Sequence, residues 1–121
     1  MLTRFSHVMM YVSDLERAIA WYCRHLGFVT RMVAPGHYAS LHHAGIACRL
    51  DLHPSESQGR DVGFGPIPYF EVSELDEFLA RLAADGVRTG VPRSEGGSPR
   101  FVTIWDSEGN ALGLGEAERE R

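Results

Sequence analysis

Residues 7–28 read HVMMYVSDLERAIAWYCRHLGF, and this stretch decides the fold. Its opening alternates in the manner of a half-buried strand, which we place over residues 5–12. Alternate side chains of a strand point to opposite sides of a sheet. One side carries Val8, Met10 and Val12. The other carries His7, Met9 and Tyr11, which we expect to point away from the packed side.

The strand is predicted to run directly into an amphipathic helix. Apolar side chains recur at the spacing that places them on one stripe of a helix, namely Leu15, Ala18, Ile19, Tyr22 and Leu26. We expect the helix to begin at Ser13, where Glu16 completes a capping box. Gly27 suits the left-handed residue that closes such a helix.

This strand and helix form a unit that occurs twice, because the residues VSDLE at 12–16 return as VSELD at 72–76. In the first copy we expect further strands at 28–33, 37–43 and 46–53. In the second copy we expect a strand at 67–72, a helix from Ser73 to Gly86, and strands at 87–91, 101–105 and 111–115. A loop rich in turn residues, 54–65, separates the copies.

The predicted fold class is therefore α+β, with two βαβββ units in a single domain of 121 residues. The first unit covers about residues 1–55 and the second about residues 65–117. A ferredoxin-like βαββαβ fold is the alternative. The extra strand in each half disfavours it.

Composition excludes several classes of protein. The chain has 44% hydrophobic residues, a formal net charge of −4, no lysine and scattered arginines, which argues against a nucleic-acid partner. No apolar run approaches the roughly 18 residues that cross a bilayer, so we expect no membrane partner. Cys23 and Cys48 show no disulfide or metal spacing. A reduced, cytoplasmic location is the prediction.

Three phrases give the chain a resemblance to the vicinal oxygen chelate superfamily, which includes glyoxalase I, bleomycin-resistance proteins, fosfomycin-resistance thiol transferases and extradiol dioxygenases. Residues 7–15 resemble its opening strand and cap, and residues 18–28 its first helix. Residues 105–110 (WDSEGN) resemble the turn before its last strand. The resemblance implies curled mixed sheets with the helices on their outer faces. It also implies a homodimer, in which a second chain completes the cavity.

The resemblance further implies four positions where metal-dependent members place ligands. His7 occupies the first, but Ile67 and Gly113 occupy two others and cannot bind a metal. The fourth falls on Arg49, or on Asp51 if the strand shifts by one pleat, which is two residues. We therefore expect no metal and no other cofactor, with His7 as the one candidate ligand.

The open face of the predicted sheets carries the candidate site residues. His7 is the candidate catalytic residue, as a general base, although a hydrogen-bonded histidine lining the pocket is the plainer interpretation. Arg49 could clamp a ligand anion or pair with Asp51 or Glu71. The candidate ligand-binding residues are Tyr11, Arg49, Asp51, Tyr69, Glu71 and Trp105, of which the aromatic ones could stack on a planar ligand or simply pack.

The leading functional hypothesis is a metal-independent protein that binds a small organic molecule in a dimer cavity. One alternative is a metal-dependent enzyme of the glyoxalase (lyase or isomerase) or dioxygenase kind that uses His7. Another is a structural or regulatory dimer with no ligand. The sequence does not choose between enzyme and binding protein.

Overall fold

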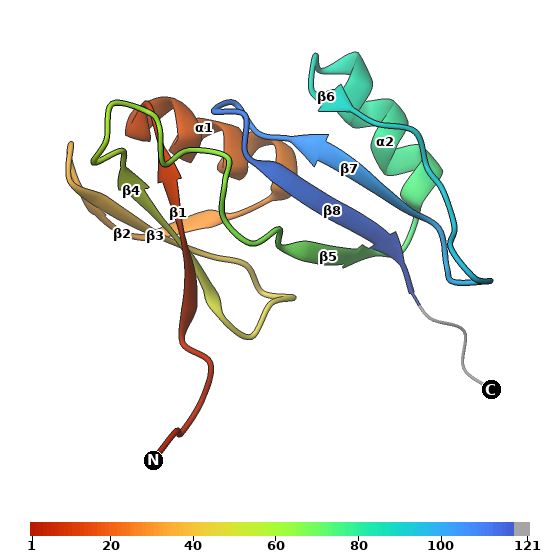
Figure 1. Cartoon of the computed structure of the whole chain (residues 1–121), viewed down its shortest axis with the longest axis horizontal. Helices are drawn as coiled ribbons and strands as arrows, with labels where there is room; N and C mark the ends of the chain where they lie inside the picture. The colour runs from red at the N-terminus through yellow and green to blue at the C-terminus, as the bar shows by residue number, and fades with distance from the viewer. Residues whose placement is uncertain (118–121) are drawn as a thin grey trace. The chain divides into compact units, whose positions relative to one another are not determined.

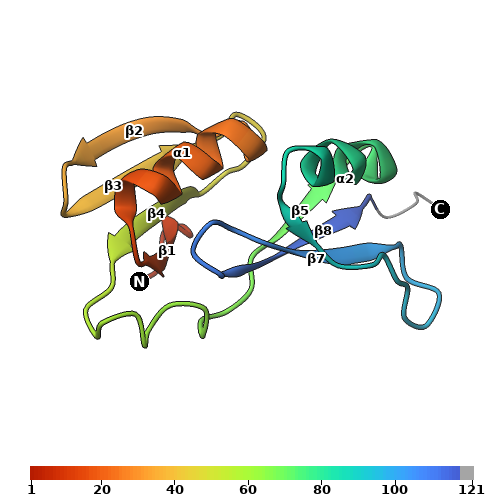
Figure 2. The ribbon, with the colours of Figure 1, turned by 90° about the horizontal axis from the view of Figure 1, so that it is seen from above.

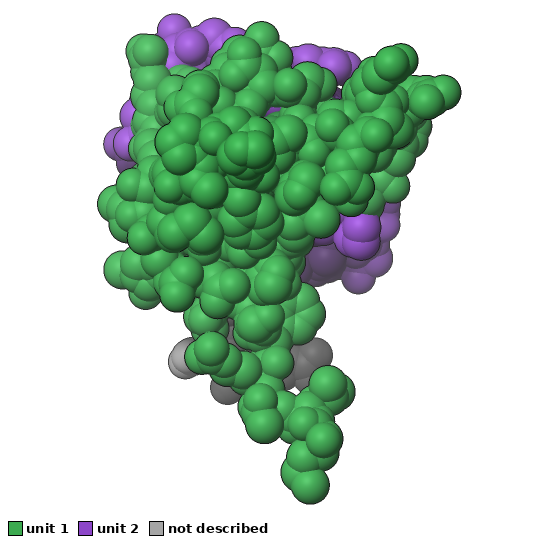
Figure 3. Space-filling view, turned by 90° about the vertical axis from the view of Figure 1, so that its left-hand side faces the viewer, with its two compact units in different colours: residues 1–65 green, residues 66–121 purple. Residues whose placement is uncertain are grey.

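The structure is a computed structural model, and it describes residues 1–117. The chain forms two compact units, one over Met1–Gly65 and a second from Pro66 onward (Figure 3). We describe each unit by itself.

Unit 1 contains one helix and one four-stranded sheet (Figure 1). Its elements are β1 (His7–Val12), α1 (Leu15–Leu26), β2 (Val29–Ala34), β3 (Tyr38–His42) and β4 (Arg49–Pro54). The strand order is β1-β4-β3-β2, in which β1 and β4 are parallel and the other pairs antiparallel.

Unit 2 repeats this topology. Its elements are β5 (Tyr69–Val72), α2 (Leu75–Ala84), β6 (Arg88–Thr89), β7 (Phe101–Trp105) and β8 (Ala111–Glu116). The strand order is β5-β8-β7-β6, again with the first pair parallel. The prediction of an α+β fold with two βαβββ units is confirmed.

The predicted helix starts were each one residue too early. Asp14 caps α1, and its side chain accepts a hydrogen bond from the backbone N–H of Arg17 at 3.0 Å. A carboxylate there also favours the positive end of the helix dipole, which the hydroxyl of Ser13 does not. Glu74 precedes α2 in place of Ser73, without a side-chain capping bond. Gly27 ends α1 in the left-handed conformation, as predicted.

Several strands begin later than the sequence pattern indicated, among them β1, which begins at His7 and not at residue 5, and two of these shifts have a local cause. The strand expected from residue 46 begins at Arg49, because the backbone N–H of Ile46 donates to the carbonyl of His43 in a turn. The strand expected from residue 67 begins at Tyr69, after Pro68, which has no N–H for a sheet ladder. Ile67 therefore lies outside the strand that was expected to contain it.

Each helix covers one face of the sheet in its own unit (Figure 2). The covered face of unit 1 holds the buried side chains of Val12, Leu15, Ala18, Tyr22, Leu41, Leu50 and Leu52. The corresponding core of unit 2 holds Leu75, Leu82, Val102, Ile104, Leu112 and Leu114. Strand alternation places the candidate site residues on the opposite, open faces. No helix among residues 1–117 is long and apolar enough to cross a membrane.

Candidate functional site

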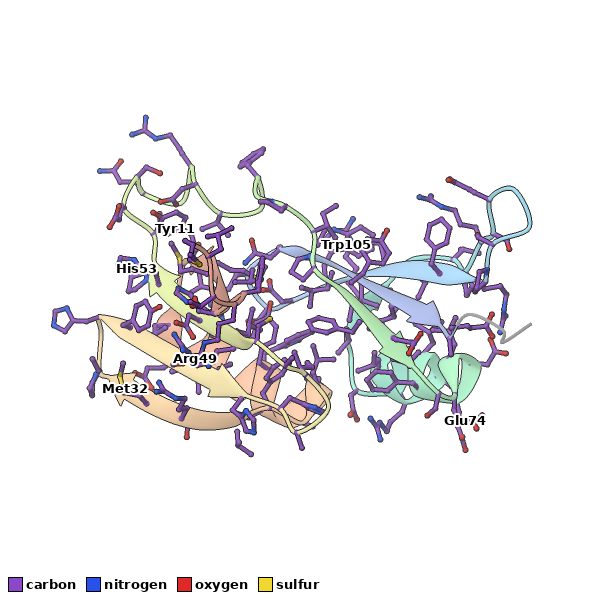
Figure 4. The ribbon with its side chains drawn as sticks, turned by 90° about the horizontal axis from the view of Figure 1, so that it is seen from below. Tyr11, Met32, Arg49, His53, Glu74 and Trp105 are labelled. Carbon is purple, nitrogen blue, oxygen red and sulfur yellow. The ribbon has the colours of Figure 1, made fainter. Side chains whose placement is uncertain are left out.

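The open face of unit 1 is built from three neighbouring strands. The parallel register of β1 and β4 places His7 beside Arg49, Met9 beside Asp51 and Tyr11 beside His53. The antiparallel register of β4 and β3 places Ser40 on the other side of Asp51. Figure 4 labels Tyr11, Arg49 and His53 on these strands. Asp51 thus sits in the middle of a polar face.

Asp51 is a buried carboxylate whose two oxygens are both hydrogen-bonded. Its side chain is 1% exposed. The Tyr38 hydroxyl donates to Oδ2, and the Ser40 hydroxyl donates to Oδ1 at 2.7 Å. Burial alone would raise the pKa of Asp51, but these bonds and the charge of Arg49 outweigh burial and hold the pKa below its ordinary value. Asp51 is therefore ionised at neutral pH.

Arg49 supplies the positive charge that this carboxylate requires. Its Nε donates to the Ser40 hydroxyl at 3.1 Å, and its Nη2 lies 3.5 Å from Oδ2 of Asp51. The same Nη2 donates to Nδ1 of His7 at 3.3 Å. Arg49 was predicted either to clamp a ligand anion or to pair with an acidic residue, and the pair with Asp51 is present. Its Nη1 group has no hydrogen bond to a residue within 1–117.

The hydrogen bonds of His7 determine where its proton lies when the ring is neutral. A guanidinium can only donate, so Nδ1 of His7 is the acceptor of the bond from Arg49. The hydroxyl of Ser6 also lies 2.8 Å from Nδ1. The proton is consequently on Nε2, which faces Oδ2 of Asp51 at 3.8 Å. In neutral His7, Nδ1 is thus an acceptor already bonded to Arg49, and Nε2 is a donor.

Tyr11 belongs to a second cluster at the far end of the same face. Its hydroxyl donates to Glu56 at 3.5 Å, and its ring meets the ring of His53 edge-on. Nε2 of His53 lies 3.7 Å from Oε1 of Glu56. The negative charge of Glu56 is the main reason that the pKa of Tyr11 is raised. Tyr11 is therefore neutral at physiological pH and acts as a donor.

The open face of unit 2 has a different, aromatic character. Tyr69 and Gly113 are register neighbours on β5 and β8, and Thr103 on β7 lies on the other side of Gly113. The ring of Tyr69 covers Gly113 so closely that a methyl group there would lie 2.3 Å from Cδ2 of the ring. Glycine is required at this strand position because another group occupies the space of a side chain.

The two ends of this aromatic face differ in charge. At one end the guanidinium of Arg88 lies over the ring of Trp105, with Cζ 4.0 Å from the ring centroid. At the other end lie Phe101, in edge contact with Tyr69, and Glu71, which is exposed on β5. Tyr69, Glu71 and Trp105 thus share one face of unit 2, as their positions in the strands indicated.

The four positions of the metal-dependent pattern do not fit a divalent ion. His7 and Asp51 already contact the guanidinium of Arg49, and two unit charges 4 Å apart repel by about 4 kcal/mol at an effective dielectric of 20. Ile67 has no ligand atom and lies outside β5. Gly113 has no side chain, and Tyr69 occupies its space. Residues 1–117 contain no group of three or more His, Cys, Asp or Glu arranged to hold a metal.

Several residues of these faces were missed by the sequence reasoning. Tyr38 and Ser40 hydrogen-bond Asp51, His53 and Glu56 contact Tyr11, and Arg88 stacks on Trp105. The alternation of Tyr38 and Ser40 along β3 was a usable signal, because both lie on the side of the sheet opposite Ala39 and Leu41. Arg88 gave no comparable signal, since its two-residue strand is too short to show alternation.

Comparison with known proteins agrees with this architecture. A crystal structure of TnmS3, an antibiotic binding protein from Streptomyces sp. CB03234, is 23% identical, with a TM-score of 0.83, and the match covers 97% of this chain and 98% of that one. Lactoylglutathione lyase from Agrobacterium tumefaciens is 19% identical, with a TM-score of 0.73 and coverage of 96% and 95%. At these identities the likeness shows the fold.

A third similar structure holds a metal. It is a mutant of the fosfomycin resistance protein FosX from Listeria monocytogenes, complexed with Mn(II) and 1S,2S-dihydroxypropylphosphonic acid. It is 19% identical, with a TM-score of 0.77 and coverage of 95% of this chain and 90% of that one. No curated protein matches the sequence. The profile of the Glyoxalase/Bleomycin resistance protein/Dioxygenase superfamily matches residues 4–114, and the chain belongs to that superfamily.

Proposed function

We propose that this protein binds a small organic molecule without a metal ion, on the open faces of its sheets and in a cavity completed by a second copy of the chain. One observation carries the proposal: the guanidinium of Arg49 contacts both His7 and Asp51. The two side chains that would bind a metal cation therefore already contact the positive charge of Arg49. Arg49 keeps N–H groups at Nη1 that can bind a ligand oxygen.

The state of His7 supports binding in preference to catalysis by this residue. A general base needs a free lone pair directed at the proton that it removes. In neutral His7, Nδ1 accepts from Arg49 and faces Ser6, while Nε2 carries the proton. His7 is thus arranged to donate a hydrogen bond. The likeness to TnmS3 supports binding as one use of this fold.

The metal requirement is tested by elemental analysis of protein purified without chelator. We expect far less than one divalent ion per chain and the same thermal midpoint with and without EDTA. A stoichiometric divalent metal, lost together with stability on EDTA treatment, would overturn the proposal. Light scattering tests the dimer, for which we expect a mass twice the 13.5 kDa of one chain.

Ligand binding is tested by calorimetry with bleomycin and fosfomycin as probes, with EDTA present throughout. We expect one of them to bind, and we expect Arg49→Gln to weaken that binding about tenfold by removing a charge-assisted donor. Arg31→Gln is the matched control, because Arg31 lies on the exposed edge strand β2. Equal loss in both variants would contradict the proposal.

A further inference from the structure

We propose that the open face of unit 2 takes a planar aromatic ligand that carries a negative charge, with its ring over Tyr69 and its anionic group on Arg88. The inference rests on the proposed function and names the chemical class of the ligand. The observation behind it is the contrast between the two open faces. Unit 1 presents a hydrogen-bonded polar network, whereas unit 2 presents aromatic rings and an uncommitted guanidinium.

The aromatic floor of this face is formed by Tyr69. Its ring lies flat enough over Gly113 to exclude any side chain there, yet 56% of Tyr69 is exposed. An exposed ring lying on a glycine offers its outer surface to a second ring. Its hydroxyl has no hydrogen bond to another residue within 1–117, so that group can still bind a polar atom of a ligand.

The positive end of the face is formed by Arg88. Its guanidinium stacks on Trp105 and makes no hydrogen bond or ion pair with the described part of the chain. Stacking holds the planar group in place while leaving its in-plane N–H donors available, which is the geometry that binds a carboxylate or sulfonate. Arg49 of unit 1, in contrast, shares its Nη2 between His7 and Asp51.

Spacing and charge distribution restrict the ligand. The Tyr69 ring lies over Gly113 on β8, and the Arg88 guanidinium lies over Trp105 on β7. Trp105 is two residues beyond Thr103, the partner of Gly113, so the ring and anion positions differ by one strand spacing and two residues, about 8 Å on the diagonal. A fused two-ring acid spans that separation. Glu71 is at the opposite end of the face, in register with Gly115. A ligand therefore gains most when its negative charge points toward Arg88.

The test uses 2-naphthoate as the probe and full-length protein. Two comparison probes change one property each: decahydro-2-naphthoate is not planar, and 2-(aminomethyl)naphthalene is a cation. Calorimetry gives the affinity, and NMR follows the indole N–H signals of the two tryptophans. We expect 2-naphthoate to bind at least fivefold more tightly than either comparison probe. We also expect it to shift the signal of Trp105 and not that of Trp21.

The variant Arg88→Gln should raise the dissociation constant for 2-naphthoate about threefold to tenfold, since one charged contact at an exposed site is lost. It should leave binding of the neutral methyl ester unchanged within twofold. Arg81→Gln is the matched control: Arg81 also stacks on an aromatic ring, that of Phe78, but on helix α2. We expect no effect there.

The outcomes separate this inference from the proposed function. Equal binding of the cationic or saturated probe overturns the inference. A probe that shifts the His7 signals and leaves Trp105 unchanged also overturns it, while the proposed function stands. Failure of 2-naphthoate, bleomycin and fosfomycin alike overturns both.

Discussion

Tyr69 and Gly113 are a coupled pair: the tyrosine ring fills the space that any side chain at position 113 would need. They are 44 residues apart in sequence and become neighbours through the parallel register of β5 and β8. This pair removes a ligand position of the metal-dependent pattern. It also creates the aromatic floor of unit 2.

Gly113→Ala should therefore displace Tyr69. We expect the free energy of unfolding to fall by about 1 kcal/mol, because the ring must rotate away and lose its contact with Phe101. Gly115→Ala is the control, since a methyl group there would lie 4.0 Å from its nearest neighbour, the carbonyl oxygen of Arg100. Urea unfolding measures both. In a Tyr69→Ala background, Gly113→Ala should have no further effect, and a persisting loss would refute the coupling.

Tyr38→Phe should destabilise unit 1 through Asp51. The variant removes a donor to a buried carboxylate, which costs about 1–3 kcal/mol when the acceptor is left unsatisfied. Tyr11→Phe removes a comparable hydroxyl whose 3.5 Å bond to Glu56 is exposed, so we expect a change below about 0.5 kcal/mol. Chemical denaturation distinguishes the two. Equal losses of stability would mean that the hydrogen bond from Tyr38 to Asp51 contributes no more than the exposed bond from Tyr11 to Glu56.

Tyr38 should also resist ionisation by alkali. Burial, followed by the hydrogen bond to Asp51 and its charge, raises the pKa of Tyr38 from 10.0 to about 12. A raised pKa stabilises the folded state fully below pH 10, and the contribution is lost as the pH rises toward 12. Ultraviolet titration of the folded protein, which has four tyrosines, should show one late-titrating phenol fewer in Tyr38→Phe than in the wild type. A wild-type titration without that late step would be inconsistent with this prediction.

Arg100 should control two acidic pKa values in unit 2. Its guanidinium forms paired hydrogen bonds with Asp76 and with Glu116, all between 3.0 and 3.1 Å. These bonds hold the pKa of each carboxyl below its ordinary value. The stabilising contribution is present above the ordinary carboxyl pKa values and is lost as the pH falls through the lowered ones.

Arg100→Gln should move both pKa values upward in an NMR titration of the side-chain carboxyls. The shift should shrink in high salt, because the groups are exposed and the interaction is screened. Arg24→Gln removes the same charge from the last turn of α1 and serves as the control. Equal shifts in both variants would show an effect of net charge alone.

Neutral His7 should carry its proton on Nε2. Long-range ¹⁵N NMR distinguishes the two tautomers directly. The expectation follows from the bond that Arg49 donates to Nδ1. A spectrum of the Nδ1–H tautomer would show that Arg49 does not make this bond in solution, and would remove the main support for metal-independent binding.

The sequence alone determined the order of the elements and the repeat. These depend on local physics: the stripe of apolar residues in α1, the left-handed Gly27 and the alternation in β1 and β7 are all set within about a dozen neighbouring residues. The ends of elements were less certain, because Asp14 competed with Ser13 for the cap and the turn after His43 delayed β4 to Arg49.

Only the tertiary structure decided the chemistry of the two open faces. Whether Arg49 holds a ligand or pairs with Asp51 depends on Tyr38 and Ser40, which reach Asp51 only through the register of β3 against β4. The contact of the Tyr69 ring with Gly113 likewise depends on the register of β5 against β8. Register follows from loop lengths, bulges and packing across the whole sheet, so contacts between distant strands cannot be derived from the local pattern of either one.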